Sequence, residues 1–175
     1  MNSSEENNEK RESSEFQENL NILREISFFS GFPLEALKVL AYLCTRENYQ
    51  SGDYIFNQKD DDGQAFVIIA GKARLFHKDE IEEEAIRDYD EGTFIGGLTL
   101  MANLRRLFSL KALTDLTCLI LTRDKFSRAM EQFPDLMPKA IKALVENIQL
   151  WEERFLAERD SSCVPCRHKV GVSLL

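Results

Sequence analysis

The feature that most constrains this chain is a series of short apolar runs separated by turn residues, with no helix-length segment between them. The candidate strands are residues 54–56, 65–70, 72–77, 84–89, 108–112 and 117–121. Glycines at 52, 63, 71 and 92 mark the joints. Because parallel strands need a long crossover, usually a helix, this spacing predicts an antiparallel sandwich or barrel of the jelly-roll type over about residues 46–122.

Helical periodicity flanks the predicted sandwich on both sides. Apolar residues at helical spacing predict helices over residues 20–29 and 34–44, with a Ser-Gly-Phe-Pro break between them. A second helical pair is predicted over residues 123–159, interrupted near Pro134. We therefore expect one mainly β domain over residues 19–159, with two N-terminal helices and a long C-terminal helix. Residues 1–18 read as a flexible acidic tail and residues 160–175 as a second tail.

Charge narrows the classes of partner. The chain of 175 residues carries 30 acidic and 22 basic side chains, a net charge of −8, which repels phosphate backbones and anionic lipid. No apolar run approaches the roughly 20 residues that span a bilayer, and the polar N-terminus does not resemble a signal peptide. We expect no nucleic-acid or membrane partner and a cytoplasmic location.

Four segments in order resemble the cyclic nucleotide-binding domain shared by catabolite activator proteins and the regulatory subunits of cyclic-AMP-dependent protein kinase. They are LREISFF at 23–29, GDYIF at 52–56, AFVIIAGKA at 65–73, and the phosphate-binding cassette from Gly92 to Arg106. The resemblance covers about residues 20–155. It implies an antiparallel β jelly-roll and a cyclic nucleotide as the possible ligand, with no other cofactor.

The resemblance also implies which residues bind the ligand. These candidates are Gly96, Gly97, Leu98, Thr99, Arg106 and Leu107. Backbone N–H groups at the start of the cassette helix suit a phosphate, and the Arg106 guanidinium matches phosphate oxygens in geometry and charge.

Two positions depart from the family pattern. Gly97 stands where the family has a glutamate that accepts the ribose 2′-hydroxyl, and Leu107 stands where a small residue admits the phosphate. An unpaired buried hydroxyl costs about 1–3 kcal/mol, equivalent to roughly tenfold to hundredfold in affinity. We therefore expect binding weaker than is usual in the family.

The last predicted helix carries an apolar seam at alternating steps of three and four residues. Its members are Ile141, Leu144, Ile148, Trp151 and Phe155. Such a seam indicates either a homodimer interface or a helix packed on its own domain. Trp151 either caps a bound purine by stacking or belongs to the interface.

No residue set indicates catalysis or a metal site. The two histidines are too few for a cupin-type metal centre, and Cys163 and Cys166 have no second ligand pair nearby. Cys44 and Cys118 lie in apolar segments and are expected to be buried, reduced thiols, and residues 60–63 read as a solvated turn.

We expect a non-enzymatic, stand-alone sensor that signals to an unknown effector protein through its C-terminal helix. The alternative is a degenerate domain that binds no nucleotide and serves in dimerisation or docking.

Overall fold

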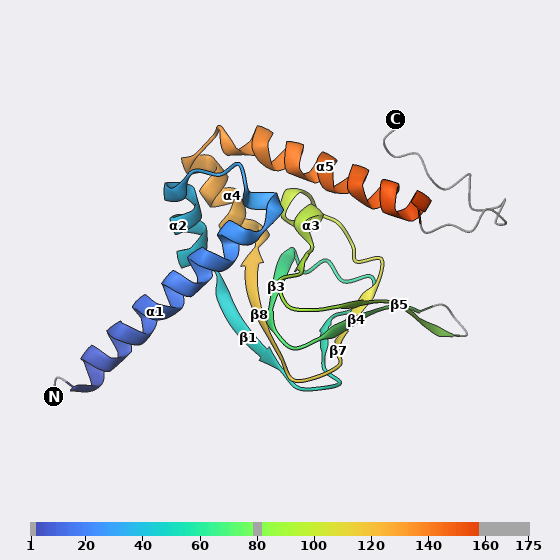
Figure 1. The fold of residues 1–175 in the computed structure, drawn as a ribbon, viewed down its shortest axis with the longest axis horizontal. Helices are drawn as coiled ribbons and strands as arrows, with labels where there is room; N and C mark the ends of the chain where they lie inside the picture. The colour runs from blue at the N-terminus through green and yellow to red at the C-terminus, as the bar shows by residue number, and fades with distance from the viewer. Residues whose placement is uncertain (1–2, 79–81, 158–175) are drawn as a thin grey trace.

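The computed structural model describes residues 3–78 and 82–157 (Figure 1). Its helices are α1 (Ser3–Glu25), the short 3-10 helix η1 (Ser27–Phe29), α2 (Leu34–Leu43), α3 (Gly97–Met101), α4 (Arg123–Gln132) and α5 (Leu136–Ala157). Its strands are β1 (Thr45–Tyr49), β2 (Tyr54–Phe56), β3 (Gln64–Ala70), β4 (Ala73–Lys78), β5 (Glu83–Tyr89), β6 (Phe94–Ile95), β7 (Ser109–Ala112) and β8 (Leu116–Thr122).

Within the described residues, the strands form two four-stranded antiparallel sheets. One sheet has the order β1-β8-β3-β6 and the other β2-β7-β4-β5. Most neighbouring strands lie far apart in sequence, as in the pairing of Phe66 with Ile120, whereas β4 and β5 are consecutive and pair directly. This arrangement confirms the predicted mainly β jelly-roll with flanking helices.

The central strands of the first sheet, β3 and β8, are buried on both faces, which explains their continuous apolar runs. Along β3, Ala65 and Val67 face the helices, whereas Phe66 and Ile68 face the second sheet. Strand β8 alternates in the same way. A strand covered on both sides needs apolar residues at every position rather than at every second one.

The helices pack together against the outer face of this first sheet. Phe28 and Phe29 of η1 are 1% exposed, and Phe28 contacts Phe94 and Phe126, with ring centroids 5.2 Å and 6.2 Å away. Figure 1 shows α1, α2 and α4 at one side of the barrel and α5 crossing above it. None of the helices in the described ranges is long and apolar enough to span a membrane.

Helix α1 replaces the flexible tail expected over residues 1–18. It begins at Ser3, and the segment carries glutamates at 5, 6, 9, 12, 15 and 18, which favour helix even without apolar periodicity. Arg46 anchors its second half by donating to Asn19 at 2.8 Å and by pairing with Glu18 at 3.1 Å. The polar composition was misread as disorder.

Other element boundaries differ in small ways from the prediction. The sequence did not predict strand β1, because its segment, TRENY, is polar. It did not predict β6 either, because that strand has only two residues. Helix α5 begins at Leu136 and includes Pro138 in its first turn, where a proline removes no helical hydrogen bond. The expected tail over residues 160–175, with Cys163 and Cys166, lies outside the described residues.

Candidate functional site

The helix of the cassette, α3, is preceded by a turn that only glycine fits. Gly96 precedes α3 with φ +93°, in the left-handed region. A Cβ there would lie 2.8 Å from the Gln64 carbonyl oxygen and 2.9 Å from Arg106 Nη1. Gly96 therefore lets the cassette lie directly against β3 and the Arg106 guanidinium.

Arg106 is buried behind this turn, with 7% of its surface exposed. Its Nε and Nη2 donate to the two carboxylate oxygens of Asp62 at 3.0 Å and 2.7 Å, and Nη2 also donates to the Gln64 carbonyl at 2.5 Å. The guanidinium stacks 4.0 Å from the Phe56 ring centroid. Within the described chain Nη1 makes no hydrogen bond, so the nitrogen beside Gly96 is the one left available.

Residues 60–63 are not the merely solvated turn that the sequence suggested. Asp62 is the counterion of Arg106, with a side chain that is 19% exposed, and Asp61 pairs with Arg123 at 2.9 Å. Two arginines thus neutralise two of its three carboxylates. The interpretation failed because partners 44 and 62 residues away leave no local sequence signal.

Arg123 connects three parts of the site. From the first position of α4, its Nε donates to the Thr99 carbonyl at 2.7 Å and its Nη1 to Asn103 Oδ1 at 2.6 Å. Its backbone N–H donates to the Gly63 carbonyl at 2.6 Å. Arg123 therefore ties the cassette helix, the 60–63 turn and α4 together, a function that the sequence analysis missed.

The remaining cassette candidates do not converge on one point. The buried Thr99 hydroxyl lies 2.6 Å from the Gln64 carbonyl and 2.7 Å from the Gly96 carbonyl, so it holds α3 in place. Leu107 is 72% exposed and does not fill the space beside Arg106. Gly96, Gly97 and Leu98 instead line a separate cleft.

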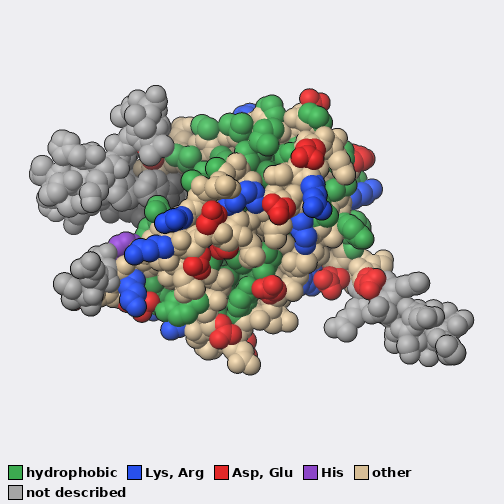
Figure 2. Space-filling view, turned by 180° about the vertical axis from the view of Figure 1, so that it is seen from behind, with side chains coloured by type: hydrophobic (Ala, Val, Ile, Leu, Met, Phe, Trp, Pro, Cys, Tyr) green, Lys and Arg blue, Asp and Glu red, His purple; other side chains and the backbone are tan. Residues whose placement is uncertain are grey.

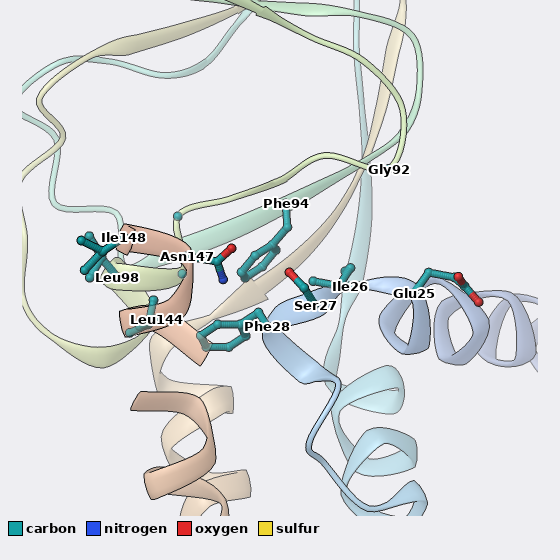
Figure 3. A pocket seen from close by; sticks show the side chains of 12 residues that line it. Glu25, Ile26, Ser27, Phe28, Gly92, Phe94, Leu98, Leu144, Asn147 and Ile148 are labelled. Atoms are coloured by element: carbon teal, nitrogen blue, oxygen red, sulfur yellow. The ribbon is translucent and has the colours of Figure 1, made fainter. Parts of the chain in front are cut away.

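This cleft lies between α5, η1 and the cassette, and its volume is about 600 Å³ (Figure 3). Its apolar walls are the side chains of Ile26, Phe28, Phe94, Leu98, Leu144 and Ile148. Ser27 and Asn147 add polar groups, and Glu25 lies at the edge with its side chain pointing away in Figure 3. A Cβ at Gly97 would point toward it, 3.1 Å from Phe94 Cε1 and 3.5 Å from Leu144 Cδ2.

The predicted seam of α5 divides between two environments. Leu144 and Ile148 face the cleft in their own domain, whereas Ile141 is 49% exposed. Trp151 and Phe155 belong to α5, but their side chains lie outside the described part of the structure. Figure 2 shows hydrophobic side chains gathered at the top of the molecule, where α5 lies. The exposed apolar residues of α5 include Met137, Ile141, Val145 and Leu150.

The described cysteines are structural. Cys118 is buried between the sheets and Cys44 is partly buried, and both are free thiols. Burial raises the pKa of each thiol to about 12, an effect that nearby Lys125 opposes at Cys44. Both are therefore protonated and unreactive near neutral pH. No group of three metal-ligating side chains occurs within residues 3–78 and 82–157.

Comparison with known proteins identifies the same domain. The family model of the cyclic nucleotide-binding domain matches residues 46–133. The cGMP-dependent protein kinase 2 of Homo sapiens is 24% identical over 145 residues, covering 81% of this chain and 19% of the kinase. The chain thus spans about a fifth of that relative. A cyclic nucleotide-binding-like protein from Brucella abortus superposes with a TM-score of 0.60 at 26% identity, over 65% of this chain and 98% of that one. The Thermus thermophilus catabolite activator protein superposes with a TM-score of 0.62 at 21% identity, covering 74% and 62% of the two chains.

Proposed function

The chain belongs to the cyclic nucleotide-binding domain family, and from this premise we propose that it is a regulatory module that binds a cyclic nucleotide or a related anion at its cassette. The observation that carries the proposal is the placement of Arg106. Its guanidinium lies directly behind the Gly96 turn, and its Nη1 has no hydrogen-bond partner among the described residues. A phosphate oxygen that reaches Nη1 gains a charge-assisted hydrogen bond in a largely buried setting.

Binding is proposed to be weak for two reasons. Asp62 already occupies Nε and Nη2, so a ligand anion shares the guanidinium with a carboxylate. Gly97 offers no acceptor for a ribose hydroxyl, and its Cβ direction leads to the cleft instead. Each effect lowers affinity without removing the cation.

Signalling is proposed to run through α4 to α5. Arg123 connects the Thr99 carbonyl, at the cassette helix, to the first turn of α4. Three residues separate α4 from α5, and Leu144 of α5 in turn lies near Gly97. A ligand that shifts the cassette therefore changes contacts at both ends of this helical pair.

A second candidate function is protein docking without nucleotide. It is favoured by the internal pairing of Arg106 with Asp62 and by the exposed apolar row of Met137, Ile141 and Val145 on α5. Homodimerisation through α5 and a cytoplasmic location stay predictions. Sedimentation at several protein concentrations tests the dimer.

Calorimetric titration with cyclic AMP, cyclic GMP and a cyclic dinucleotide separates the two functions. The wild-type protein should give saturable heat that Arg106→Lys removes, because lysine keeps the charge but loses the fork that holds Asp62 and the ligand together. Arg105→Ala is the matched control, since Arg105 is the exposed neighbour. Absence of heat up to roughly 1 mM ligand, a binding free energy of about −4 kcal/mol, would exclude the sensor function for these ligands.

Asp62→Asn provides the complementary test. The amide keeps the shape of the carboxylate but removes the charge that competes for Arg106. We expect tighter binding of the same nucleotide. Weaker binding would mean that Asp62 assists the ligand rather than competing with it.

A further inference from the structure

The cassette has two chemically different sides. Arg106 and Asp62 lie behind Gly96, whereas Gly97 and Leu98 border the cleft beneath α5. We infer that this cleft is a second binding site, which takes a neutral, mainly apolar small molecule rather than the nucleotide phosphate.

The size and walls of the cleft suit such a ligand. Its volume of about 600 Å³ falls in the range of roughly 300–1,000 Å³ typical of small-molecule pockets. Two aromatic rings, Phe28 and Phe94, lie 5.2 Å apart between centroids at one side of the cleft, and Leu144 and Ile148 of α5 contribute to the other. Leu98 is 49% exposed, so a bound apolar group covers a leucine that water now contacts.

The charge of the cleft excludes an anion. Neither lysine nor arginine contributes to its described lining, and Glu25 is the one charged residue there. A phosphate in this position meets no cation and loses its hydration, which costs free energy. The ligand is therefore chemically distinct from the one proposed for Arg106.

Two polar groups define how such a ligand is oriented. The Asn147 Nδ2 group donates to the Ala143 carbonyl at 2.9 Å, which leaves its Oδ1 without a partner among the described residues. The Ser27 hydroxyl likewise makes no hydrogen bond to a described residue, and Figure 3 shows both side chains beside Phe94. The cleft therefore fits an apolar ring system with one or two hydrogen-bonding groups.

Occupation of the cleft would act on α5. The ligand contacts Leu144 and Ile148 of α5, Phe28 of η1 and Leu98 of α3, and so fixes the distance between the long helix and the cassette. Because it touches elements that the proposed nucleotide response also uses, the two ligands are expected to influence each other.

The neutral fluorophore N-phenyl-1-naphthylamine is the probe for a direct test. Titrated against the whole chain, it should give a saturable, blue-shifted fluorescence increase with one site per chain. Ile148→Glu places a charge in the cleft and should weaken binding at least tenfold. Leu150→Glu, on an exposed apolar position of the same helix outside the cleft lining, should leave it unchanged.

A second variant and a second readout keep the test decisive. Ile148→Trp fills the cleft without adding charge, and should also weaken binding, whereas Leu150→Trp should not. Methyl NMR should show probe-induced shifts at Leu98, Leu144 and Ile148 and none at Leu150. No saturable binding, or equal affinity in the Ile148 and Leu150 variants, overturns the inference.

The proposed nucleotide site fails or succeeds separately. The probe carries no anionic group, so its binding should survive Arg106→Lys. Loss of nucleotide binding with retained probe binding would leave the cleft site standing, and the reverse result would leave the nucleotide site standing.

Discussion

The two sides of the cassette differ in their chemistry: the side behind Gly96 is ionic, and the side in front of Gly97 is apolar. Behind Gly96, a guanidinium and a carboxylate are both largely withdrawn from water and pair with each other. In front of Gly97, the walls are apolar and the space is open. One short helix thus separates a largely buried ion pair from an apolar cleft, so single substitutions can disturb either side alone.

The largest loss in the free energy of unfolding is expected from Arg106→Ala, which breaks the ion pair behind Gly96. Arg106→Ala removes the partner of Asp62 and the guanidinium that stacks on Phe56. Removing one member of a buried ion pair typically costs about 3–5 kcal/mol. Urea unfolding should show a loss of this size, and Arg105→Ala a loss within about 0.5 kcal/mol. A loss below about 1 kcal/mol for Arg106→Ala would mean that Asp62 finds water instead.

A smaller loss is expected from Arg123→Ala, which disconnects the ionic side from α4. The variant removes hydrogen bonds to Thr99, Asn103 and Asp61, but Asp61 is 41% exposed and regains water. We expect a loss of about 2 kcal/mol in the free energy of unfolding, because hydrogen bonds to charged groups contribute about 1.5–3 kcal/mol each and part is recovered.

Arg128→Ala on the same helix is the matched control for this prediction. Arg128 is exposed, and the change should fall within about 0.5 kcal/mol. Equal changes in both variants would show that the hydrogen bonds of Arg123 add no measurable stability and that Arg123 does not hold the cassette.

Gly97→Glu tests whether a side chain at residue 97 points into the apolar cleft or toward the side of Arg106. Gly97 does not have a left-handed φ, so a side chain is tolerated there once Phe94 shifts by a few tenths of an ångström. Since the Cβ points toward Phe94 and Leu144, the new carboxylate enters the cleft and should weaken binding of the neutral probe about tenfold, or 1.4 kcal/mol.

Gly97→Ala controls for the added Cβ in that experiment and should have little effect on the probe. Unchanged probe affinity in Gly97→Glu, together with tighter nucleotide binding, would place residue 97 on the ionic side. The resemblance to the family would then describe this position better than the geometry does.

The sequence predicted the buried strands of the fold, but not the polar strand β1, the partner of Arg106 or the cleft. The runs of β3 and β8 were found because a strand buried on both faces leaves a continuous apolar signal, whereas polar β1 left none. The resemblance pointed to Arg106 as a candidate ligand contact, and this stays a prediction. The pairing of Arg106 with Asp62 was not predicted, because a charged side chain does not encode which distant residue it will meet. The cleft was missed for a similar reason, since Phe28, Leu98 and Ile148 come from three separate segments.

The smallest expected effect is a change in the pH dependence of unfolding caused by Cys118, in the apolar core between the two sheets. Burial raises the pKa of the Cys118 thiol to about 12, with a further contribution from the Glu47 carboxylate, whereas an unfolded cysteine titrates near 8.5. The folded pKa is the higher one, so this stabilisation is complete below about pH 8.5 and declines as pH rises toward 12. Linkage gives a decrease of about 1 kcal/mol between pH 8.5 and 9.5. Serine does not titrate here, so the difference in unfolding free energy between wild type and Cys118→Ser should shrink by that amount over the interval. Parallel curves for the two proteins would show that water reaches Cys118 between the sheets, and the interior behind the cassette would then be less closed than the pairing of Arg106 requires.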